Sequence, residues 1–165
     1  MIKYYILCLF FTISLTVNSF SAGSSSSGGD GGSMKSNYEK AVSFIKNAKK
    51  LEKKGKIEKA NKKYEKAQKL LLKSNKKKPN KPDTLNYLGF TTRKLGDFES
   101  GEKYYLQGLA INPAHIGINE YLGELYVTTG RHNLAVERLE ILKGCNCKEY
   151  EQLKAIIAGE KVSKY

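Results

Sequence analysis

The sequence repeats itself with a spacing of 34 residues, and this internal repeat limits the possible folds more than any other feature of the chain. The repeat appears when residues 82–115 are aligned with residues 116–149. The strongest matches pair Leu88-Gly89 with Leu122-Gly123, Gly96 with Gly130, and Gly101 with Ala135. A period of this length is typical of chains built from stacked units, in which each unit buries its apolar face against its neighbours.

The repeated unit resembles the tetratricopeptide repeat, a helix–turn–helix of 34 residues. We call the first helix of each hairpin its A helix and the second its B helix. The small residues Gly89 and Gly123 match positions where the B helix crosses the A helix, so that the two backbones can approach closely. Gly96 and Gly130 match the end of the A helix, where a left-handed residue is needed and glycine adopts it at least cost.

A degenerate copy of the unit precedes the two clear ones. When Ala60 is placed at the small-residue position of the B helix, Gly55 falls at the end of the A helix. This copy starts at Ala41, which is 41 residues before the next copy at Pro82. The seven surplus residues fall in 73–79, so we expect them to lengthen the B helix before the prolines end it.

One more helix is expected after the repeats. Tyr150, Leu153, Ile156 and Ile157 lie on one face of a helix over about 148–160, which would cover the apolar end of the stack. The predicted fold is therefore all-α, a TPR-like helical-hairpin solenoid of three repeats with a C-terminal capping helix. The domain would span 38–165, with repeats at about 41–81, 82–115 and 116–147.

The N-terminal region has a different composition. Residues 4–17 are uncharged and mostly apolar, which is too short for a comfortable membrane span but suits a signal-peptide core. Small residues then favour a cut at Ser21–Ala22 or just after Ala22, with an uncleaved anchor as the alternative. We therefore expect a signal peptide at 1–21, a flexible Gly/Ser-rich linker at 22–37, and a periplasmic or secreted protein.

The positive charge is concentrated at the start of the domain. Residues 35–81 contain 18 lysines, no arginine and four acidic residues, whereas residues 82–165 contain 10 basic and 11 acidic residues. Lysines on solvated helix faces are ordinary solubilising residues, and a genome with an AT-biased base composition would favour lysine codons. The Lys-rich stretch 49–81 would alternatively bind an anionic envelope surface. Nucleic acid is not an expected partner, because arginine is scarce and no reading motif is present.

Catalytic motifs are nearly absent, so neither an enzyme nor a cofactor is expected. Glu120 and Glu124 are carboxylates at i and i+4 on one helix face, but no nucleophile or metal motif accompanies them. His115 and His132 both occupy turn or helix-start positions that the repeat explains.

Cys145 and Cys147 are the cysteines that would remain after removal of the signal peptide. They could form a disulfide, stay reduced in a turn, or bind a soft metal together with His132. The resemblance to secreted bacterial proteins with similar helices favours a local structural disulfide between the two. No other metal site is expected.

The family resemblance also implies where a partner would bind, because A helices line the concave face of such solenoids. Fold alone does not fix function, although this fold is overwhelmingly used for protein–protein contact. We therefore expect a non-enzymatic interaction module of the bacterial cell envelope, with a Lys-rich surface-binding protein as the alternative. Phe90 would either anchor the partner or pack against the neighbouring A helix. The expected groove residues are Ile45, Lys49, Asn86, Phe90, Arg93, Glu120 and Glu124.

Overall fold

The computed structural model describes residues 35–161, and this part of the chain consists of seven α-helices with no strand. The expected signal peptide at 1–21 and the linker up to residue 34 lie outside the described residues. None of the described helices has the length and apolar character needed to cross a membrane. The helices are α1 (Asn37–Glu52), α2 (Ile57–Lys77), α3 (Pro82–Lys94), α4 (Phe98–Ile111), α5 (Ile116–Thr128), α6 (His132–Leu142) and α7 (Lys148–Ile157).

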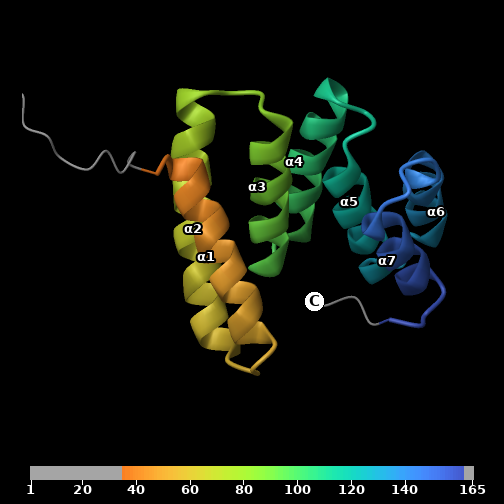
Figure 1. Ribbon diagram of the computed structural model, residues 1–165, viewed down its shortest axis with the longest axis horizontal. Coiled ribbons are helices and arrows are strands. Elements are labelled where there is room, and N and C mark those ends of the chain that lie inside the picture. Colours follow the sequence, from red (N-terminus) through yellow and green to blue (C-terminus); the bar gives the residue numbers. More distant parts are fainter. Residues whose placement is uncertain (1–34, 162–165) are drawn as a thin grey trace, which may run out of the picture. The chain divides into compact units, whose positions relative to one another are not determined.

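The first six helices form three antiparallel hairpins, α1/α2, α3/α4 and α5/α6 (Figure 1). Each hairpin packs on the next through α2 against α3 and α4 against α5, and α7 packs against both α5 and α6. The predicted fold, a TPR-like stack of three hairpins with a C-terminal capping helix, is confirmed.

The A helices end at glycines with a left-handed backbone. Gly55, Gly96 and Gly130 have φ angles of 69°, 97° and 74°, as the sequence pattern predicts. α2 has 21 residues, against 14 in α4 and 11 in α6, and it ends before Pro79. The first B helix is therefore the long one.

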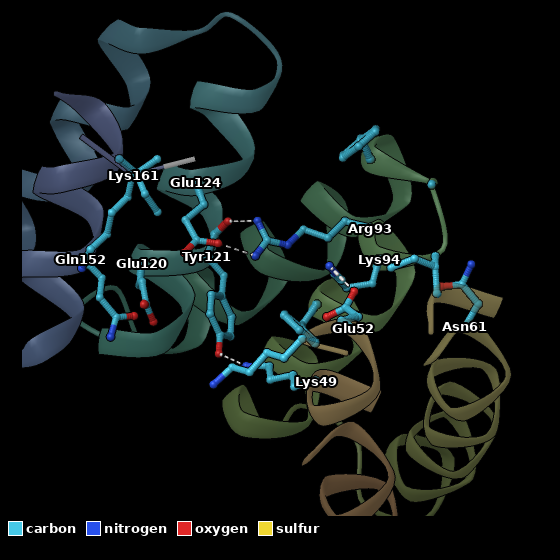
Figure 2. Close-up of a pocket in the computed structure, with 16 residues that line it drawn as sticks. Lys49, Glu52, Asn61, Arg93, Lys94, Glu120, Tyr121, Glu124, Gln152 and Lys161 are labelled. Atoms are coloured by element: carbon cyan, nitrogen blue, oxygen red, sulfur yellow. Dashed lines mark hydrogen bonds and ion pairs between the residues drawn. The ribbon is translucent and has the colours of Figure 1, made fainter. Parts of the chain in front are cut away.

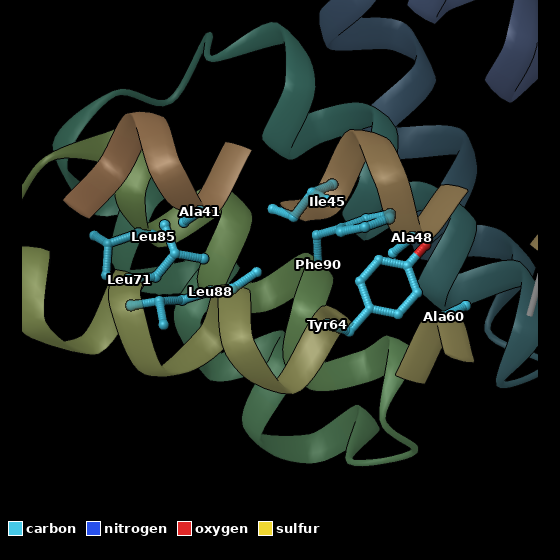
Figure 3. Packing of buried hydrophobic residues seen from close by; sticks show 10 residues of the cluster. Ala41, Ile45, Ala48, Ala60, Tyr64, Leu71, Leu85, Leu88 and Phe90 are labelled. Carbon is cyan, nitrogen blue, oxygen red and sulfur yellow. The ribbon is translucent and has the colours of Figure 1, made fainter. Parts of the chain in front are cut away.

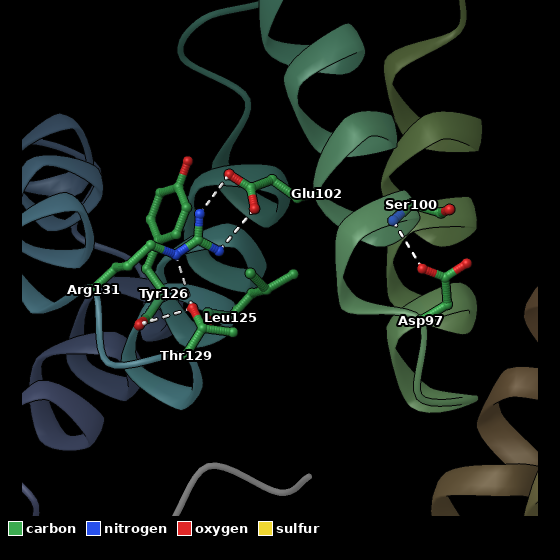
Figure 4. Close-up of polar contacts among 7 residues, drawn as sticks. All are labelled: Asp97, Ser100, Glu102, Leu125, Tyr126, Thr129 and Arg131. Atoms are coloured by element: carbon green, nitrogen blue, oxygen red, sulfur yellow. Dashed lines mark hydrogen bonds and ion pairs between the residues drawn. The ribbon is translucent and has the colours of Figure 1, made fainter.

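Side-chain caps hold the starts of α1, α4 and α5, and an ion pair joins two of the hairpins. Ser36 and Glu39 form a reciprocal capping box at the start of α1. Figure 4 shows the cap of α4, where the Asp97 carboxylate accepts a hydrogen bond from the Ser100 backbone N–H at 2.9 Å. The same figure shows Arg131, just before α6, donating to both carboxylate oxygens of Glu102 on α4 at 2.9 and 2.7 Å. This bidentate pair connects the second hairpin to the third.

The first hairpin and α3 share an apolar cluster. Alanines on both helices let α1 and α2 approach closely, while larger side chains from α2 and α3 fill the space between them (Figure 3). Leu88 lies within this cluster and is fully buried. The cluster consists of Ala41, Ile45, Ala48, Ala60, Tyr64, Ala67, Leu71, Leu85, Leu88 and Phe90.

The two repeat glycines meet different partners. A Cβ on Gly89 would lie 2.5 Å from the ring of Tyr105 on α4, so this glycine does admit the B helix of its own hairpin. A Cβ on Gly123 would instead lie 2.5 Å from Leu153 of α7. The expectation that Gly123 meets its own B helix is therefore wrong. α7 takes that place, and Leu139 of α6, which aligns with Tyr105, is only half-buried.

Leu88→Asp should unfold the helical region. A buried, unpaired charge costs several kcal/mol, which is on the order of the whole free energy of unfolding of a domain. Circular dichroism should show loss of helix at 25 °C. Leu106→Asp is the matched control, because Leu106 on α4 is 47% exposed and its variant should melt near the wild-type temperature. Equal melting of the two variants would contradict the placement of the repeat core.

Candidate functional site

A cavity of about 1120 Å³ lies between the three A helices and α7 (Figure 2). We call it the A-helix cavity. Its lining combines charged side chains with aromatic and aliphatic ones from six helices. The lining residues are Lys49 and Glu52 from α1, Ile57 and Asn61 from α2, Phe90, Arg93 and Lys94 from α3, Phe98 from α4, Glu120, Tyr121 and Glu124 from α5, Gln152 and Ile156 from α7, and the loop residues Lys53, Gly96 and Lys161.

Arg93 joins the second A helix to the third. Its side chain is fully buried, and its Nη2 donates to Glu124 Oε2 at 2.8 Å. Its Nη1 donates to the backbone carbonyl of Tyr121 at 2.7 Å. A buried ion pair with additional hydrogen bonds fixes geometry, because breaking it leaves a charge without compensation. The wall between α3 and α5 is therefore preorganised.

Lys49 reaches across from α1 to the same wall. Its Nζ donates to the Tyr121 hydroxyl at 3.0 Å and lies 4.4 Å from the centre of the Phe90 ring. The Phe90 and Tyr121 rings are 5.0 Å apart. Burial lowers the pKa of Lys49, and the carboxylates of Glu120 and Glu124 oppose that shift. The ammonium group is therefore held by a hydroxyl and two ring faces.

Glu52 is occupied by two partners at the α1 end of the cavity. Lys94 Nζ lies 2.6 Å from Glu52 Oε1, and the Tyr64 hydroxyl donates to Glu52 Oε2 at 2.7 Å. Burial, followed by the hydrogen bond to Glu52, raises the pKa of Tyr64. The phenol therefore stays protonated and remains a donor at physiological pH.

Glu120 differs from the other two carboxylates of the cavity. It is 5% exposed, and its carboxylate makes no hydrogen bond or ion pair with any residue in the described part of the chain. Burial, followed by the nearby charges of Glu124 and Glu149, raises the pKa of Glu120 to about 8. Lys49 and Arg93 oppose this shift.

Five of the seven side chains that the sequence places in a groove line this cavity: Lys49, Phe90, Arg93, Glu120 and Glu124. Two of the seven, Ile45 and Asn86, do not line it. Ile45 is 2% exposed and packs in the apolar cluster between α1, α2 and α3. Asn86 is 7% exposed and lies against α5, where a Cβ on Gly117 would be 2.8 Å from Asn86 Nδ2.

Phe90 is a packing residue. It is 4% exposed, and its ring contacts Tyr64 at 5.7 Å and Tyr121 at 5.0 Å between ring centres. Lys49 covers it as well. The alternative that Phe90 anchors a partner is therefore disfavoured, because little of the ring is left to contact one.

The sequence pattern does not identify several of the residues that line the cavity. Tyr121 follows Glu120 in the chain, yet no motif marks it as the acceptor for Lys49. Gln152 and Ile156 belong to α7, which the pattern predicts only as a cap. The apolar face of α7 was the available signal, because a helix packed on α5 must also border any groove that α5 lines.

The turn between α6 and α7 contains a disulfide. Cys145 and Cys147 are bonded, with their Cα atoms 5.1 Å apart, and Asn146 between them has a φ angle of 47°. Neither cysteine lines the A-helix cavity. No group of potential metal ligands is found among residues 35–161, and His132 is not joined to the cysteines there.

Glu120→Gln should stabilise the protein at alkaline pH. A carboxyl whose pKa rises on folding from 4.5 to about 8 contributes stability below pH 4.5 that is lost as pH rises through about 8. A neutral amide suffers no such loss. The melting temperature of the variant should match wild type near pH 4.5 and exceed it by several degrees above pH 8.

Glu99→Gln is the control for this comparison, because the Glu99 side chain is 82% exposed. Its difference from wild type should not grow with pH. A Glu120→Gln difference that stays constant from pH 4.5 to pH 9 would show that Glu120 ionises normally in the folded protein.

Part of the sequence, and the fold of the described residues, resemble known tetratricopeptide-repeat domains. A family model of the tetratricopeptide repeat matches residues 83–115. No curated protein sequence matches the chain. Among solved structures, the first TPR domain of human RPAP3 is similar with a TM-score of 0.54 and 19% identity, over 76% of this chain and 94% of that one.

Two further solved structures are similar at lower scores. The first TPR of Spaghetti (RPAP3) bound to the HSP90 peptide SRMEEVD has a TM-score of 0.48 and 18% identity, covering 77% of this chain and 97% of that one. The Arabidopsis OM64 TPR domain has a TM-score of 0.47 and 14% identity, covering 76% and 99%. Residues 83–115 therefore match a tetratricopeptide repeat, and the described residues have a TPR-like helical-hairpin fold.

Proposed function

We propose that this protein is a non-enzymatic interaction module of the bacterial cell envelope, and that it binds a peptide segment of a partner in the A-helix cavity. The observation that carries the proposal is the cavity itself, which six helices line with charged, aromatic and aliphatic side chains. Its volume of about 1120 Å³ lies just above the range for small-molecule sites, roughly 300–1,000 Å³.

The hydrogen bonds of the cavity wall support binding rather than catalysis. Arg93 is engaged by Glu124 and a backbone carbonyl, Lys49 by a phenol, and Glu52 by Lys94. Groups held in this way keep their positions when a ligand arrives, which lowers the entropic cost of binding. No nucleophile stands beside a base among these lining residues.

The cellular location rests on the N-terminal sequence. The apolar core and small residues before Ala22 favour export. The disulfide between Cys145 and Cys147 fits an oxidising compartment, where such bonds persist.

The Lys-rich surface supports a second candidate function. Most lysines of α2 are exposed, among them Lys66, Lys69 and Lys73. Such a surface would attract anionic lipid head groups or polymers of the envelope. The two candidates use different faces of the protein, so position-specific crosslinking separates them.

A photo-crosslinking residue at Gln152 should capture a protein partner in intact cells. Gln152 lines the A-helix cavity and is half-buried. The photo-crosslinking residue placed at Lys69 instead tests the Lys-rich surface. Placed at Leu106, an exposed position on α4, it serves as the control. An adduct from Gln152 alone supports the cavity. Capture from Lys69 with none from Gln152 would replace this function with the basic-surface one.

N-terminal sequencing of the protein recovered from cells tests export. The mature N-terminus should fall between Phe20 and Gly23, because the small residues before the cut suit a signal peptidase. Recovery in the cytoplasm with Met1 intact would rule out the envelope role and leave the cavity proposal standing.

A further inference from the structure

We propose that the A-helix cavity recognises a cationic group of its ligand, the guanidinium of an arginine or the ammonium of a lysine, and that Glu120 is the residue that binds it. This inference rests on the proposed function and deepens it by naming the chemistry of the bound segment.

Glu120 is the lining carboxylate left over once the pairs within the described residues are assigned. Glu124 is paired with Arg93 at 2.8 Å, and Glu52 with Lys94 at 2.6 Å. Glu120 is only 5% exposed and lines the cavity, and it has no ion-pair partner among the described residues. Burying a carboxylate without a partner is costly, and a cation delivered by a ligand would remove that cost.

The nearest cations of the wall are occupied elsewhere. Both terminal nitrogens of Arg93 donate to residues other than Glu120. Lys49 donates to the Tyr121 hydroxyl and lies over the Phe90 ring. Each therefore tempers the negative potential at Glu120 without forming an ion pair with it.

The α5–α7 side of the cavity is negatively charged. Glu124 on α5 and Glu149 on α7 both act on Glu120. Gln152 on α7 also lines the cavity and lies beside Glu120 (Figure 2). The amide oxygen of Gln152 is a further acceptor for a guanidinium or an ammonium. A planar guanidinium suits the site best, because it can donate to both oxygens of one carboxylate and still reach a second acceptor.

An anionic ligand group is less favoured beside Glu120 than a cation. When Glu120 is ionised, the anion would meet it together with Glu124 and Glu149, and like charges at close range repel. Lys49, Arg93 and Lys161 line the same cavity and weaken this repulsion. The preference for a cation therefore comes from Glu120, which makes no ion pair within the described residues.

The test uses n-butylguanidinium chloride as a minimal arginine probe and n-butylurea as its neutral counterpart, at constant ionic strength and pH 8.5. Binding is followed by NMR through the side-chain amide of Gln152 and the methyl groups of Ile156, which both border the cavity. The cation should produce saturable shifts with a Kd in the millimolar range, about 1 mM. Equal shifts from n-butylurea would overturn the proposal.

Variants assign the binding to Glu120. Glu120→Gln should weaken the probe at least about tenfold, whereas Glu99→Gln, an exposed carboxylate on α4, should leave it unchanged. Unchanged binding in Glu120→Gln overturns the proposal. Lys161 also lines the cavity and is the competing cation within the chain. If only a Lys161→Gln variant binds the probe, Glu120 serves an internal ion pair and the proposal fails.

The pH dependence provides an independent readout. Below pH 8 Glu120 is largely protonated and offers a cation little, so affinity should rise from pH 6.5 to pH 9. The charged or titratable groups around Glu120 are Lys49 on α1, Arg93 on α3, Tyr121 and Glu124 on α5, Glu149 on α7, and Lys161 after α7. The rise should disappear in Glu120→Gln, and a rise that persists there would assign the effect to one of these neighbours.

A peptide array separates this inference from the proposed function. The array holds short peptides that carry arginine, lysine, norleucine or glutamate at one position within neutral sequences. Selection of arginine or lysine that is lost in Glu120→Gln supports both proposals. Binding of peptides regardless of a basic residue overturns the cation site and keeps the peptide-binding function. Binding of n-butylguanidinium with no peptide bound at all supports the cation site and overturns the peptide-binding function.

Discussion

The Arg93 guanidinium is buried between α3 and α5, and the arrangement of the A helices depends on how its charge is satisfied. Its side chain is fully buried, and it donates to Glu124 and to the Tyr121 carbonyl. A guanidinium removed from water is expensive unless nearly every donor is satisfied, so the helices that supply its acceptors cannot move independently. One side chain thus fixes how the second hairpin meets the third and holds the wall of the cavity.

This constraint explains which parts of the structure follow from the sequence. The repeat pattern predicts the hairpins, the left-handed glycines and the close approach at Gly89, because each is a local requirement that a residue type satisfies by itself. Glu120 and Glu124 look equivalent in the sequence, four residues apart on one helix. Arg93, 31 residues away in the chain, pairs with Glu124 and leaves Glu120 facing the cavity. The sequence pattern does not show this difference.

The last hairpin also has a contact that the repeat pattern does not predict. Gly123 matches Gly89 in the sequence, but Leu153 of α7 fills the space that Tyr105 fills in the second hairpin. α6 is shorter than α4 and ends at Leu142, after which the disulfide-bridged turn brings the chain back onto α5. A repeat pattern describes neighbours within the repeat, so it cannot state what an added helix will contact. Ile45 and Asn86 lie outside the cavity lining for a related reason, since the pattern gives the helix but not how deeply each neighbour covers it.

Basic side chains predominate on the α1–α2 side of the cavity and carboxylates on the α5–α7 side. Lysines dominate α2 and the end of α1, while the α5–α7 side carries the three carboxylates Glu120, Glu124 and Glu149. Exposed lysines act over about 8 Å at physiological ionic strength, so they set how a charged segment approaches but contribute little once it is bound. Buried carboxylates are screened much less and act at contact distance. A segment with one basic residue among acidic or neutral ones would therefore be drawn by its acidic part toward the lysines and fixed by its basic residue at Glu120. The two charge patterns of the chain would then act on different steps of the same binding event.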